Sequence, residues 1–306
     1  MKGKKRLNDL HNGTLYVVST PIGNLEDLTF RAKRILTSVN IIAAENISRT
    51  KKLCNYYEIT TKIISCNQHN QKKIAPFILK KLESESDIAI VSDAGTPGIS
   101  DPGTYLVSQA AKKGIRIIPV PGPCAVITSL SISGMPADRF YFNGFLSNKS
   151  GKRQKTLQTL IPIPKTLVFF EAPHRLESML MDIKQVLGDR QIVMHREITK
   201  TYEEVIRGPV STILTHIKEN PVKGEITLVV EGNQQKKLPD LSKATLNRID
   251  SLLLNHKMSV KEISQLISQE KGLTYRRIYK ECLLRKRALL NQSEEVNIAN
   301  KLNCHK

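Results

Sequence analysis

The first 125 residues alternate short apolar runs with amphipathic stretches. The apolar runs are rich in Ile and Val and contain few polar positions; they lie at 15–20, 40–45, 62–66, 88–92 and 116–120. Runs without polar alternation are typical of strands that are covered on both faces, as in a parallel sheet. Helical periodicity separates them at 28–36, 49–56, 71–82 and 102–113. This order predicts βαβ units in an α/β domain.

The helix predicted at 102–113 has recognisable end residues. Asp101 is suited to cap its first turn, and Pro102 to occupy the first helical position. Gly114 is expected to end it in a left-handed conformation.

The pattern changes after residue 135. Apolar runs at 166–171, 191–197 and 225–230, with one helical stretch at 176–187, predict a second α/β lobe with a mixed sheet. The polar, cationic segment 148–155 is expected to be an exposed loop.

The remaining tail is predicted to be helical. Ser259 precedes apolar residues at helical spacing, Gly272 interrupts the pattern, and Thr274 opens a second helix through Leu290. Two short helices around a Gly turn resemble a helix-turn-helix unit. The predicted organisation is a basic extension (1–13), an N-terminal α/β lobe of mainly parallel sheet (14–134), a C-terminal α/β lobe (135–235) and a basic helical tail (240–306).

Composition adds limits on class. A chain of 306 residues with 40% hydrophobic residues is too apolar to be disordered and is long enough for about two domains. No apolar run approaches the roughly 18–20 residues of a membrane span, and no apolar signal core follows the basic start. The five cysteines form no Cys-x-x-Cys pair. We therefore expect a soluble cytoplasmic protein without a metal site.

The formal charge of +19 has two readings. One is a Lys-rich, well-solvated surface, and the other is attraction to a polyanion such as nucleic acid. Charge alone does not separate them. In the tail, Arg276, Arg277 and Lys280 cluster with Tyr275 and Tyr279, a combination that suits nucleic-acid phosphates and bases and that an ordinary solvated helix face also shows.

Candidate chemistry lies in Gly- and Pro-rich segments that follow three of the predicted strands, at 20–25, 92–103 and 119–123. Ligands of open α/β sheets collect at the carboxyl ends of strands. None of the segments matches a dinucleotide or NTP phosphate loop, a Gly-x-Ser-x-Gly elbow or a His-Glu-x-x-His helix. The residues alone predict an α/β enzyme with a small-molecule site lined by backbone.

Taken in order, six segments resemble the ribosomal RNA small subunit methyltransferase I family, which is part of the wider tetrapyrrole methylase family. They are Thr20-Pro21-Ile22-Gly23-Asn24-Leu25, the loop 92–103, Pro121-Gly122-Pro123-Cys124-Ala125, Glu171-Ala172-Pro173-His174-Arg175, Arg196-Glu197-Ile198-Thr199-Lys200-Thr201 and Lys223-Gly224-Glu225. The resemblance covers about 14–232 and implies a two-lobed homodimer that binds S-adenosylmethionine between its lobes. It also implies 2′-O-methylation of a cytidine in 16S ribosomal RNA, within the small ribosomal subunit.

The resemblance assigns residues by motif. The residues expected to bind the cofactor are Pro21, Asp93, Ala94, Gly95, Thr96, Ile99, Ala125, Thr128, Phe170 and Glu225. The residues expected to contact RNA are Asn24, His69, Asn70, Arg153, Arg175, Arg276, Arg277 and Lys280. The catalytic candidates, which would accept the hydroxyl proton or stabilise the alkoxide, are His174, Glu197 and Lys200. His174 equally suits an orienting hydrogen bond, and Glu197 a structural ion pair.

One segment departs from the family pattern. Where the family has Ala-Glu-Asp-Thr-Arg, this chain has Ala44-Glu45-Asn46-Ile47-Ser48, and Arg49 comes one place later. The departure supports an alternative, a non-catalytic rRNA-binding or assembly factor that keeps the methyltransferase fold. A tetrapyrrole methyltransferase is a further alternative. It is disfavoured by the basic tail and by Gly95-Thr96-Pro97, which stands where those enzymes have a Gly-Asp-Pro loop.

Overall fold

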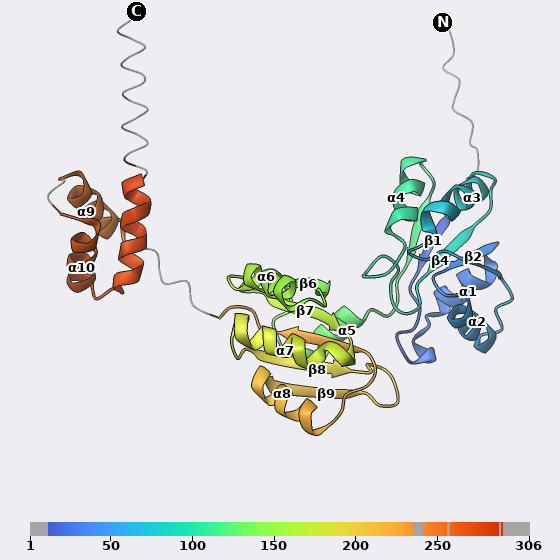
Figure 1. Ribbon diagram of the computed structural model, residues 1–306. Coiled ribbons are helices and arrows are strands. Elements are labelled where there is room, and N and C mark those ends of the chain that lie inside the picture. The colour runs from blue at the N-terminus through green and yellow to red at the C-terminus, as the bar shows by residue number, and fades with distance from the viewer. Residues whose placement is uncertain (1–11, 235–240, 256–257, 288, 290–306) are drawn as a thin grey trace, which may run out of the picture. The chain divides into compact units, whose positions relative to one another are not determined.

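The computed structural model describes residues 12–234, 241–255, 258–287 and 289 (Figure 1). The chain divides into two compact units, one up to Gln234 and one from Gln235 onward.

The first unit begins with a five-stranded parallel sheet. Its strands are β1 (Leu15–Val18), β2 (Ile41–Ala44), β3 (Lys62–Ser65), β4 (Ile88–Val91) and β5 (Ile117–Val120). They lie in the order β3-β2-β4-β1-β5, and every pair is parallel. Because β1 lies between β4 and β5, the three Gly- and Pro-rich segments leave the sheet from adjacent strands.

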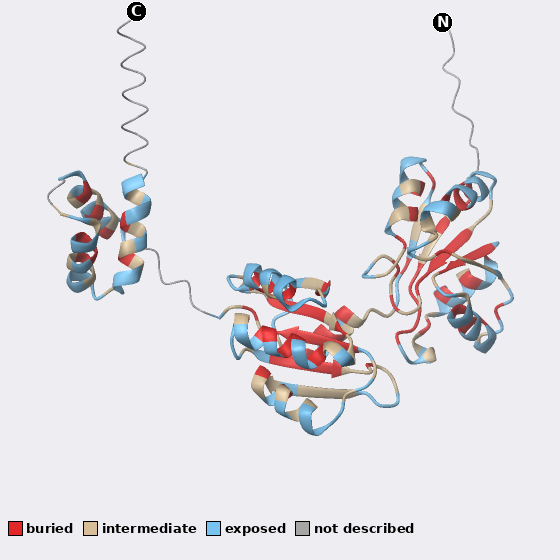
Figure 2. Cartoon of the chain, in the orientation of Figure 1, coloured by how far each residue is buried: buried red, intermediate tan, exposed pale blue. Residues whose placement is uncertain are grey.

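Helices cover both faces of this sheet. They are η1 (Leu25–Asp27, a 3-10 turn), α1 (Phe30–Ser38), α2 (Ile47–Tyr56), α3 (Gln71–Glu83) and α4 (Thr104–Lys112). Residues alternate between the two cores along each strand: Ile42 packs with residues of α1 and α2, and Ile41 with residues of α3 and α4. Figure 2 shows the buried strands between helices whose outer faces are exposed. The predicted parallel sheet is confirmed.

The start of α4 differs from the sequence prediction. The helix begins at Thr104 with Gly103 at the N-cap position, and no side chain of the described residues caps it. Asp101 and Pro102 therefore lie in the preceding loop, and their predicted helical roles are wrong. The cause is Gly103, whose φ of +142° turns the chain one residue after Pro102. Gly114 does adopt a left-handed conformation, with φ of +68°.

The second sheet of this unit is mixed. It comprises β6 (Phe140–Phe145), β7 (Thr166–Glu171), β8 (Gln191–Arg196), β9 (Glu204–Pro209) and β10 (Ile226–Val230), in the order β6-β7-β10-β8-β9. The pair β6–β7 is parallel and the other pairs are antiparallel. The sequence pattern predicted β7, β8 and β10 and missed the two edge strands.

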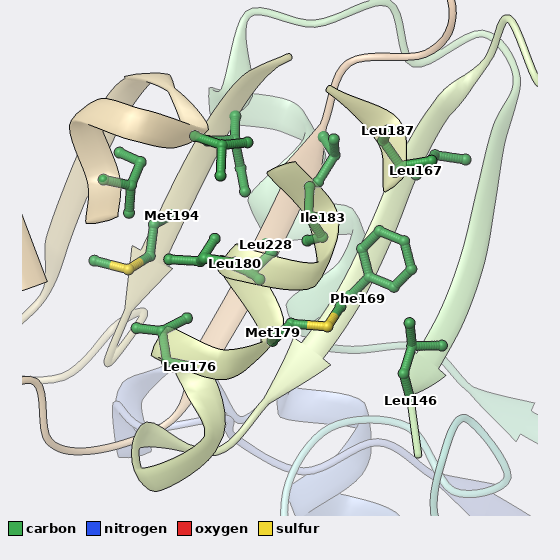
Figure 3. Packing of buried hydrophobic residues seen from close by; sticks show 14 of the residues in the cluster. Leu146, Leu167, Phe169, Leu176, Met179, Leu180, Ile183, Leu187, Met194 and Leu228 are labelled. Carbon is green, nitrogen blue, oxygen red and sulfur yellow. The ribbon is translucent and has the colours of Figure 1, made fainter. Parts of the chain in front are cut away.

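Four helices accompany this sheet. α6 (Ser150–Leu160), α7 (Pro173–Leu187) and α8 (Val210–Glu219) share one apolar core with it, and α5 (Ala125–Ser133) packs with Val168, Val193 and Val229. In Figure 3, Met179, Leu180 and Ile183 of α7 lie among sheet residues such as Phe169 and Leu228.

The predicted exposed loop at 148–155 is wrong, because α6 begins at Ser150. Helix α6 buries Arg153, which is 1% exposed, together with Leu157 and Leu160.

The second unit is helical. It contains α9 (Lys243–Leu254), α10 (Val260–Lys271) and a further helical stretch at 275–287, which share a core around Ile249, Ile263 and Ile278. Ser259 forms a capping box with Glu262, and Gly272 ends α10 in a left-handed conformation. The predicted interruption of the helical pattern at Gly272 is confirmed. The predicted helix end at Leu290, most of the basic extension and the end of the tail lie outside the described residues.

The predicted fold class is confirmed: two α/β lobes, one with a parallel and one with a mixed sheet, followed by helices. Within the described part of the chain, no helix is long and apolar enough to span a membrane.

Candidate functional site

Three Gly- and Pro-rich loops meet at the carboxyl end of the parallel sheet. Thr20 and Gly95 form an isolated antiparallel bridge with reciprocal N–H to O hydrogen bonds of 2.9 and 3.0 Å. The hydroxyl of Thr96 lies 2.9 Å from that of Ser19 and donates to the carbonyl of Pro123 over 3.3 Å. These contacts bind the loops after β1, β4 and β5 into one wall.

Glycine is required at two points of this wall. Gly95 has φ of +74°, a left-handed conformation that costs other residues energy. At Gly122, a Cβ atom would lie 2.9 Å from Cβ of Ser19, closer than side chains pack. The backbone amides and carbonyls of the loops are therefore exposed to the space beside them.

That space is a cavity of about 280 Å³ within the first unit. Its walls come from both sheets; the lining residues are Ile22, Glu45, Arg49, Asp93, Ala94, Gly95, Thr96, Ile99, Ser100, Asp101, Cys124, Ala125, Phe145, Phe170, Glu171, Glu225, Ile226 and Thr227. The volume is close to the lower end of the range for small-molecule sites, about 300–1,000 Å³. On the side of the mixed sheet, the rings of Phe145 and Phe170 pack with centroids 5.6 Å apart.

Acidic side chains dominate the charge of the cavity. Among the described residues, five carboxylates line it, against one cation, Arg49. The guanidinium of Arg49 lies 3.2 Å from Oδ2 of Asp93, and the backbone N–H of Asp93 donates to Glu45 over 3.1 Å. Oδ1 of Asp93 is buried and has no hydrogen-bond partner among the described residues. With this excess of carboxylates, the cavity is suited to a cationic ligand.

Two of these carboxyl groups titrate above their ordinary range. Burial raises the pKa of Glu45, and the N–H of Asp93 offsets part of that rise. Burial, followed by repulsion from Glu45, Asp93 and Glu225, raises the pKa of Asp101 to about 7. A positive charge in the cavity would favour the ionised form of both.

The departure from the family pattern is accommodated locally. Asn46 is the N-cap of α2, and its side-chain oxygen accepts the N–H groups of Ser48 and Arg49 over 2.9 and 3.3 Å. Asn and Asp are comparable N-caps, so this replacement preserves the start of the helix. Arg49 reaches the cavity from the first turn of α2, although its position in the sequence is shifted by one.

Most of the residues predicted to bind the cofactor line this cavity: Asp93, Ala94, Gly95, Thr96, Ile99, Ala125, Phe170 and Glu225. Pro21 is buried, and Thr128 lies one turn further along α5; neither belongs to the lining.

Sequence reasoning did not assign a cavity role to Glu45, Arg49 or Asp101. Glu45 and Arg49 lay in the segment singled out as atypical. Asp101 belongs to the loop 92–103, and its position before a predicted helix led to its interpretation as a helix cap.

Two of the catalytic candidates form an ion-pair network beside the cavity. Nζ of Lys200 lies 2.8 Å from Glu197 and 3.1 Å from Glu225, and Glu197 also accepts the N–H of Glu225 over 2.8 Å. This network favours the structural interpretation of Glu197, because its carboxylate holds the start of β10. His174 is exposed at the start of α7 and does not line the cavity.

Two of the predicted RNA contacts hold the mixed lobe together instead. Arg153 lies against Asp182, with NH2 2.6 Å from Oδ2, and the two side chains are 2% and 7% exposed. Its predicted role as a phosphate partner is wrong, because RNA cannot reach a buried guanidinium. Arg175 is partly buried, pairs with Glu171 over 3.0 Å and donates to the carbonyl of Leu146.

The other predicted RNA contacts lie in turns and on the second unit. Asn24 caps η1 and donates its N–H to Thr199 over 3.1 Å. Asn70 donates to Ser65 in the turn before α3, and His69 beside it is exposed. Arg276, Arg277 and Lys280 belong to the helical stretch 275–287, and Tyr275 and Tyr279 stack there with centroids 5.7 Å apart.

No group of three or more His, Cys, Asp or Glu side chains in the described part of the chain is arranged to hold a metal ion. The five carboxylates of the cavity come from the end of β2, the loop between β4 and α4, the end of β7 and the residue before β10.

Comparison with known proteins agrees with this architecture. Residues 14–214 match the family model for tetrapyrrole (corrin/porphyrin) methylases. The chain is 46% identical to the ribosomal RNA small subunit methyltransferase I of Halalkalibacterium halodurans, over 74% of this chain and 79% of that protein. It is 42% identical to the protein of the same name from Escherichia coli O157:H7, over 90% and 96% of the two chains.

A solved structure shares the fold at low identity. It is the uroporphyrin-III C-methyltransferase from Thermus thermophilus complexed with S-adenyl homocysteine, with 17% identity, a TM-score of 0.50, and coverage of 71% of this chain and 96% of that chain. Together with the identity to the curated relatives, the loops and the two sheets show that this chain belongs to the tetrapyrrole methylase family and, within it, to the ribosomal RNA small subunit methyltransferase I family.

Proposed function

We propose that this protein transfers a methyl group from S-adenosylmethionine to the ribose 2′-oxygen of a cytidine in 16S ribosomal RNA. The observation that carries the proposal is the acidic cavity at the carboxyl ends of β1, β4 and β5. The names of the relatives support ribosomal RNA as the substrate. The 2′-oxygen and the cytidine come from the family resemblance alone.

The cavity fits the proposed donor by charge and shape. S-adenosylmethionine carries a sulfonium and an ammonium group, and the wall offers the carboxylates of Glu45, Asp93 and Glu225. Backbone groups of Ala94, Gly95 and Thr96 are suited to bind the polar atoms of its methionine part. The related structure that contains S-adenyl homocysteine supports a ligand of this class.

The bound donor supplies a methyl group on a positively charged sulfur, and the chain positions the acceptor. Displacement at the methyl carbon needs the ribose oxygen in line with the leaving sulfur, so holding the oxygen there accounts for much of the rate. Phe145, Phe170 and Ile22 give the cavity apolar walls that exclude water. A low-dielectric wall also strengthens the attraction between the carboxylates and the sulfonium.

RNA binding is assigned to the second unit. Arg276 and Lys280 are exposed on one helix beside the stacked pair Tyr275 and Tyr279. Cationic side chains bind phosphates, and aromatic faces stack on unpaired bases, as in other single-strand binding surfaces. The formal charge of +19 favours the same kind of partner.

The proposal includes a homodimer that acts in the cytoplasm on the small ribosomal subunit. Exposed apolar side chains on α5 and β6 suit a subunit interface; they are Ile127, Ile132, Phe140, Tyr141 and Phe145. Sedimentation equilibrium at micromolar concentration gives twice the chain mass if this holds, and a monomer contradicts it.

The non-catalytic alternative loses its main support. It depended on the altered segment after β2, but Asn46 still caps α2 and Arg49 still enters the cavity. The tetrapyrrole alternative remains disfavoured by the basic helical unit, because binding a small organic substrate does not require a separate cationic unit.

The experiment is methyl transfer from tritiated S-adenosylmethionine to small subunits isolated from cells that lack the protein, followed by nucleoside analysis. The proposal predicts label in 2′-O-methylcytidine only. Donor binding without transfer supports the non-catalytic alternative, and label on a base contradicts the 2′-oxygen as acceptor.

A further inference from the structure

Asp101 lies where two hollows of the first unit meet. One is the acidic cavity, and the other is a groove along the N-terminal ends of α3 and α4, lined by Gln68, Gln71, Tyr105 and Ser108 among others. Ser100 and Asp101 line both hollows. A group bound in the groove would therefore approach the cavity past these two side chains.

The backbone holds Asp101 at this junction. Gly98, with φ of +85°, donates its N–H to the carbonyl of Pro102 over 3.2 Å and so closes the loop around the intervening residues. Ser100 adopts a positive φ of +67°, which is uncommon for residues other than Gly or Asn and indicates a constrained turn. The loop conformation, rather than a cap at α4, places the Asp101 carboxylate.

The other four carboxylates of the cavity already have partners. Asp93 pairs with Arg49, and Glu225 with Lys200. Glu45 accepts the N–H of Asp93, and Glu171 pairs with Arg175. Within the part of the chain that the structure describes, Asp101 has no hydrogen bond or ion pair. Its oxygens are therefore available to a ligand.

The surroundings of Asp101 favour reversible protonation. Burial disfavours its charged form. Glu45 after β2, Asp93 after β4 and Glu225 before β10 repel its charge, whereas Arg49 of α2 is engaged by Asp93. Among the described residues that line the groove, Tyr105 of α4 is the only other titratable group. A pKa of about 7 for Asp101 is close to the value at which a general base works best at neutral pH.

We propose that Asp101 is the general base that accepts the proton of the acceptor hydroxyl, and that the groove beside it binds the acceptor nucleotide. The inference rests on the proposed function. As the bond from the ribose oxygen to the methyl carbon forms, the bond from that carbon to sulfur breaks and its electron pair stays on sulfur. The hydroxyl proton moves to Asp101, which releases it to solvent after the product leaves.

The groove is suited to a sugar. Its described lining offers amide and hydroxyl groups from Gln68, Gln71, Thr104 and Ser108. Such uncharged donors and acceptors match ribose hydroxyls, whereas phosphates would be bound by the basic groups elsewhere on the chain. The exposed His69 lies in the turn next to the groove, as its predicted RNA contact requires.

The first test compares Asp101→Asn with wild type in single-turnover methyl transfer to small subunits. Loss of a general base lowers the rate constant by roughly 10²- to 10⁴-fold. The affinity for S-adenosylmethionine, measured by isothermal titration calorimetry, falls by less than about tenfold, because the neutral Asn no longer attracts the sulfonium. Glu83→Gln is the matched control, because Glu83 is an exposed carboxylate of the same lobe that pairs with Lys113 on the surface.

The second test does not depend on catalysis. A positive sulfonium in the cavity favours ionised Asp101, so donor binding at pH 7 releases protons. Titration calorimetry in buffers of different ionisation enthalpy measures the number of protons released per donor bound. In wild type, we expect more protons to be released by S-adenosylmethionine than by S-adenosylhomocysteine, whose thioether sulfur is uncharged. In Asp101→Asn, we expect the two ligands to release the same number of protons. Equal proton release in wild type and Asp101→Asn would overturn the inference.

The wild-type pH profile gives a third measurement that needs no variant. At subsaturating donor, the transfer rate rises with pH and levels off above an apparent pKa near 7, which reports the free enzyme. A flat profile between pH 5.5 and 8.5 overturns the role of Asp101, as does loss of donor binding in Asp101→Asn. Wild-type protein that transfers nothing overturns the proposed function itself, whereas Asp101→Asn at the wild-type rate overturns only the base.

Discussion

The buried pair of Arg153 and Asp182 is expected to be a major stabilising element of the mixed lobe. The Nε and NH2 groups of Arg153 each lie 2.6 Å from Oδ2 of Asp182. NH1 and NH2 also donate to the carbonyls of Ser147 and Ser178 over 3.2 Å. This one side chain therefore joins α7 to the start of α6.

Arg153→Ala removes these contacts and leaves Asp182 charged in an apolar environment. Breaking a buried pair from one side costs about 3–5 kcal/mol. Ser150 and Gln154 still donate to Asp182 over 2.9 and 2.7 Å, which places the expected loss at the lower end, about 3 kcal/mol. At roughly 2–4 °C per kcal/mol for a unit of this size, the melting temperature falls by about 6–12 °C.

Urea unfolding followed by far-ultraviolet circular dichroism measures this loss, and calorimetry gives the melting temperature. Lys155→Ala, on the exposed side of the same helix, is the control and stays within about 0.5 kcal/mol of wild type. At a temperature where both variants are folded, RNA affinity is unchanged by Arg153→Ala. A loss of stability below 1 kcal/mol, or tenfold weaker RNA binding by the folded variant, would refute the buried role.

Three further predictions concern the cavity, the charge of the second unit and pH. Gly95→Ala places a methyl group 3.4 Å from Ile22 at a φ of +74°, so donor affinity measured by calorimetry falls at least tenfold; unchanged affinity contradicts a backbone-lined donor site. Arg276→Ala combined with Lys280→Ala reduces the slope of log affinity for small-subunit RNA against log salt by about 1.4, since each lost phosphate contact to single-stranded RNA contributes about 0.7; an unchanged slope excludes both side chains as phosphate contacts. Folded Asp101 keeps its proton up to pH of about 7, whereas the unfolded carboxyl releases it near 3.8, so its contribution to the free energy of unfolding is full below pH 3.8 and is lost as pH rises towards 7. Urea unfolding at several pH values should show Asp101→Asn losing less stability than wild type across that window, and parallel curves would contradict the raised pKa.

The sequence was sufficient to predict the parallel sheet, because buried strands are apolar on both faces. Edge strands carry a weaker signal: β9 contains Glu204, Arg207 and Gly208, and its burial is only partial. Segment 148–155 was wrongly predicted to be an exposed loop because its residues are polar and charged. Arg153 is charged but buried, and only the tertiary position of Asp182 shows that its charge is neutralised.

The candidate site was predictable where its residues lie in recognisable loops. Asp93 and Gly95 belong to a motif whose glycines indicate close approach of a ligand. Asp101 belongs to the same motif, but local capping rules gave it a different role. Its availability depends on the conformation of Gly103 and on the partners of distant carboxylates, and neither property is visible in the sequence.

The proposed methyl transfer is tested by mass spectrometry of 16S ribosomal RNA from three strains: cells with this protein, cells without it, and cells with Asp101→Asn in its place. We predict one ribose methyl group on a cytidine in the first strain, its absence in the second and its near absence in the third. The same methylated nucleotide in RNA from the strain without the protein would contradict the account.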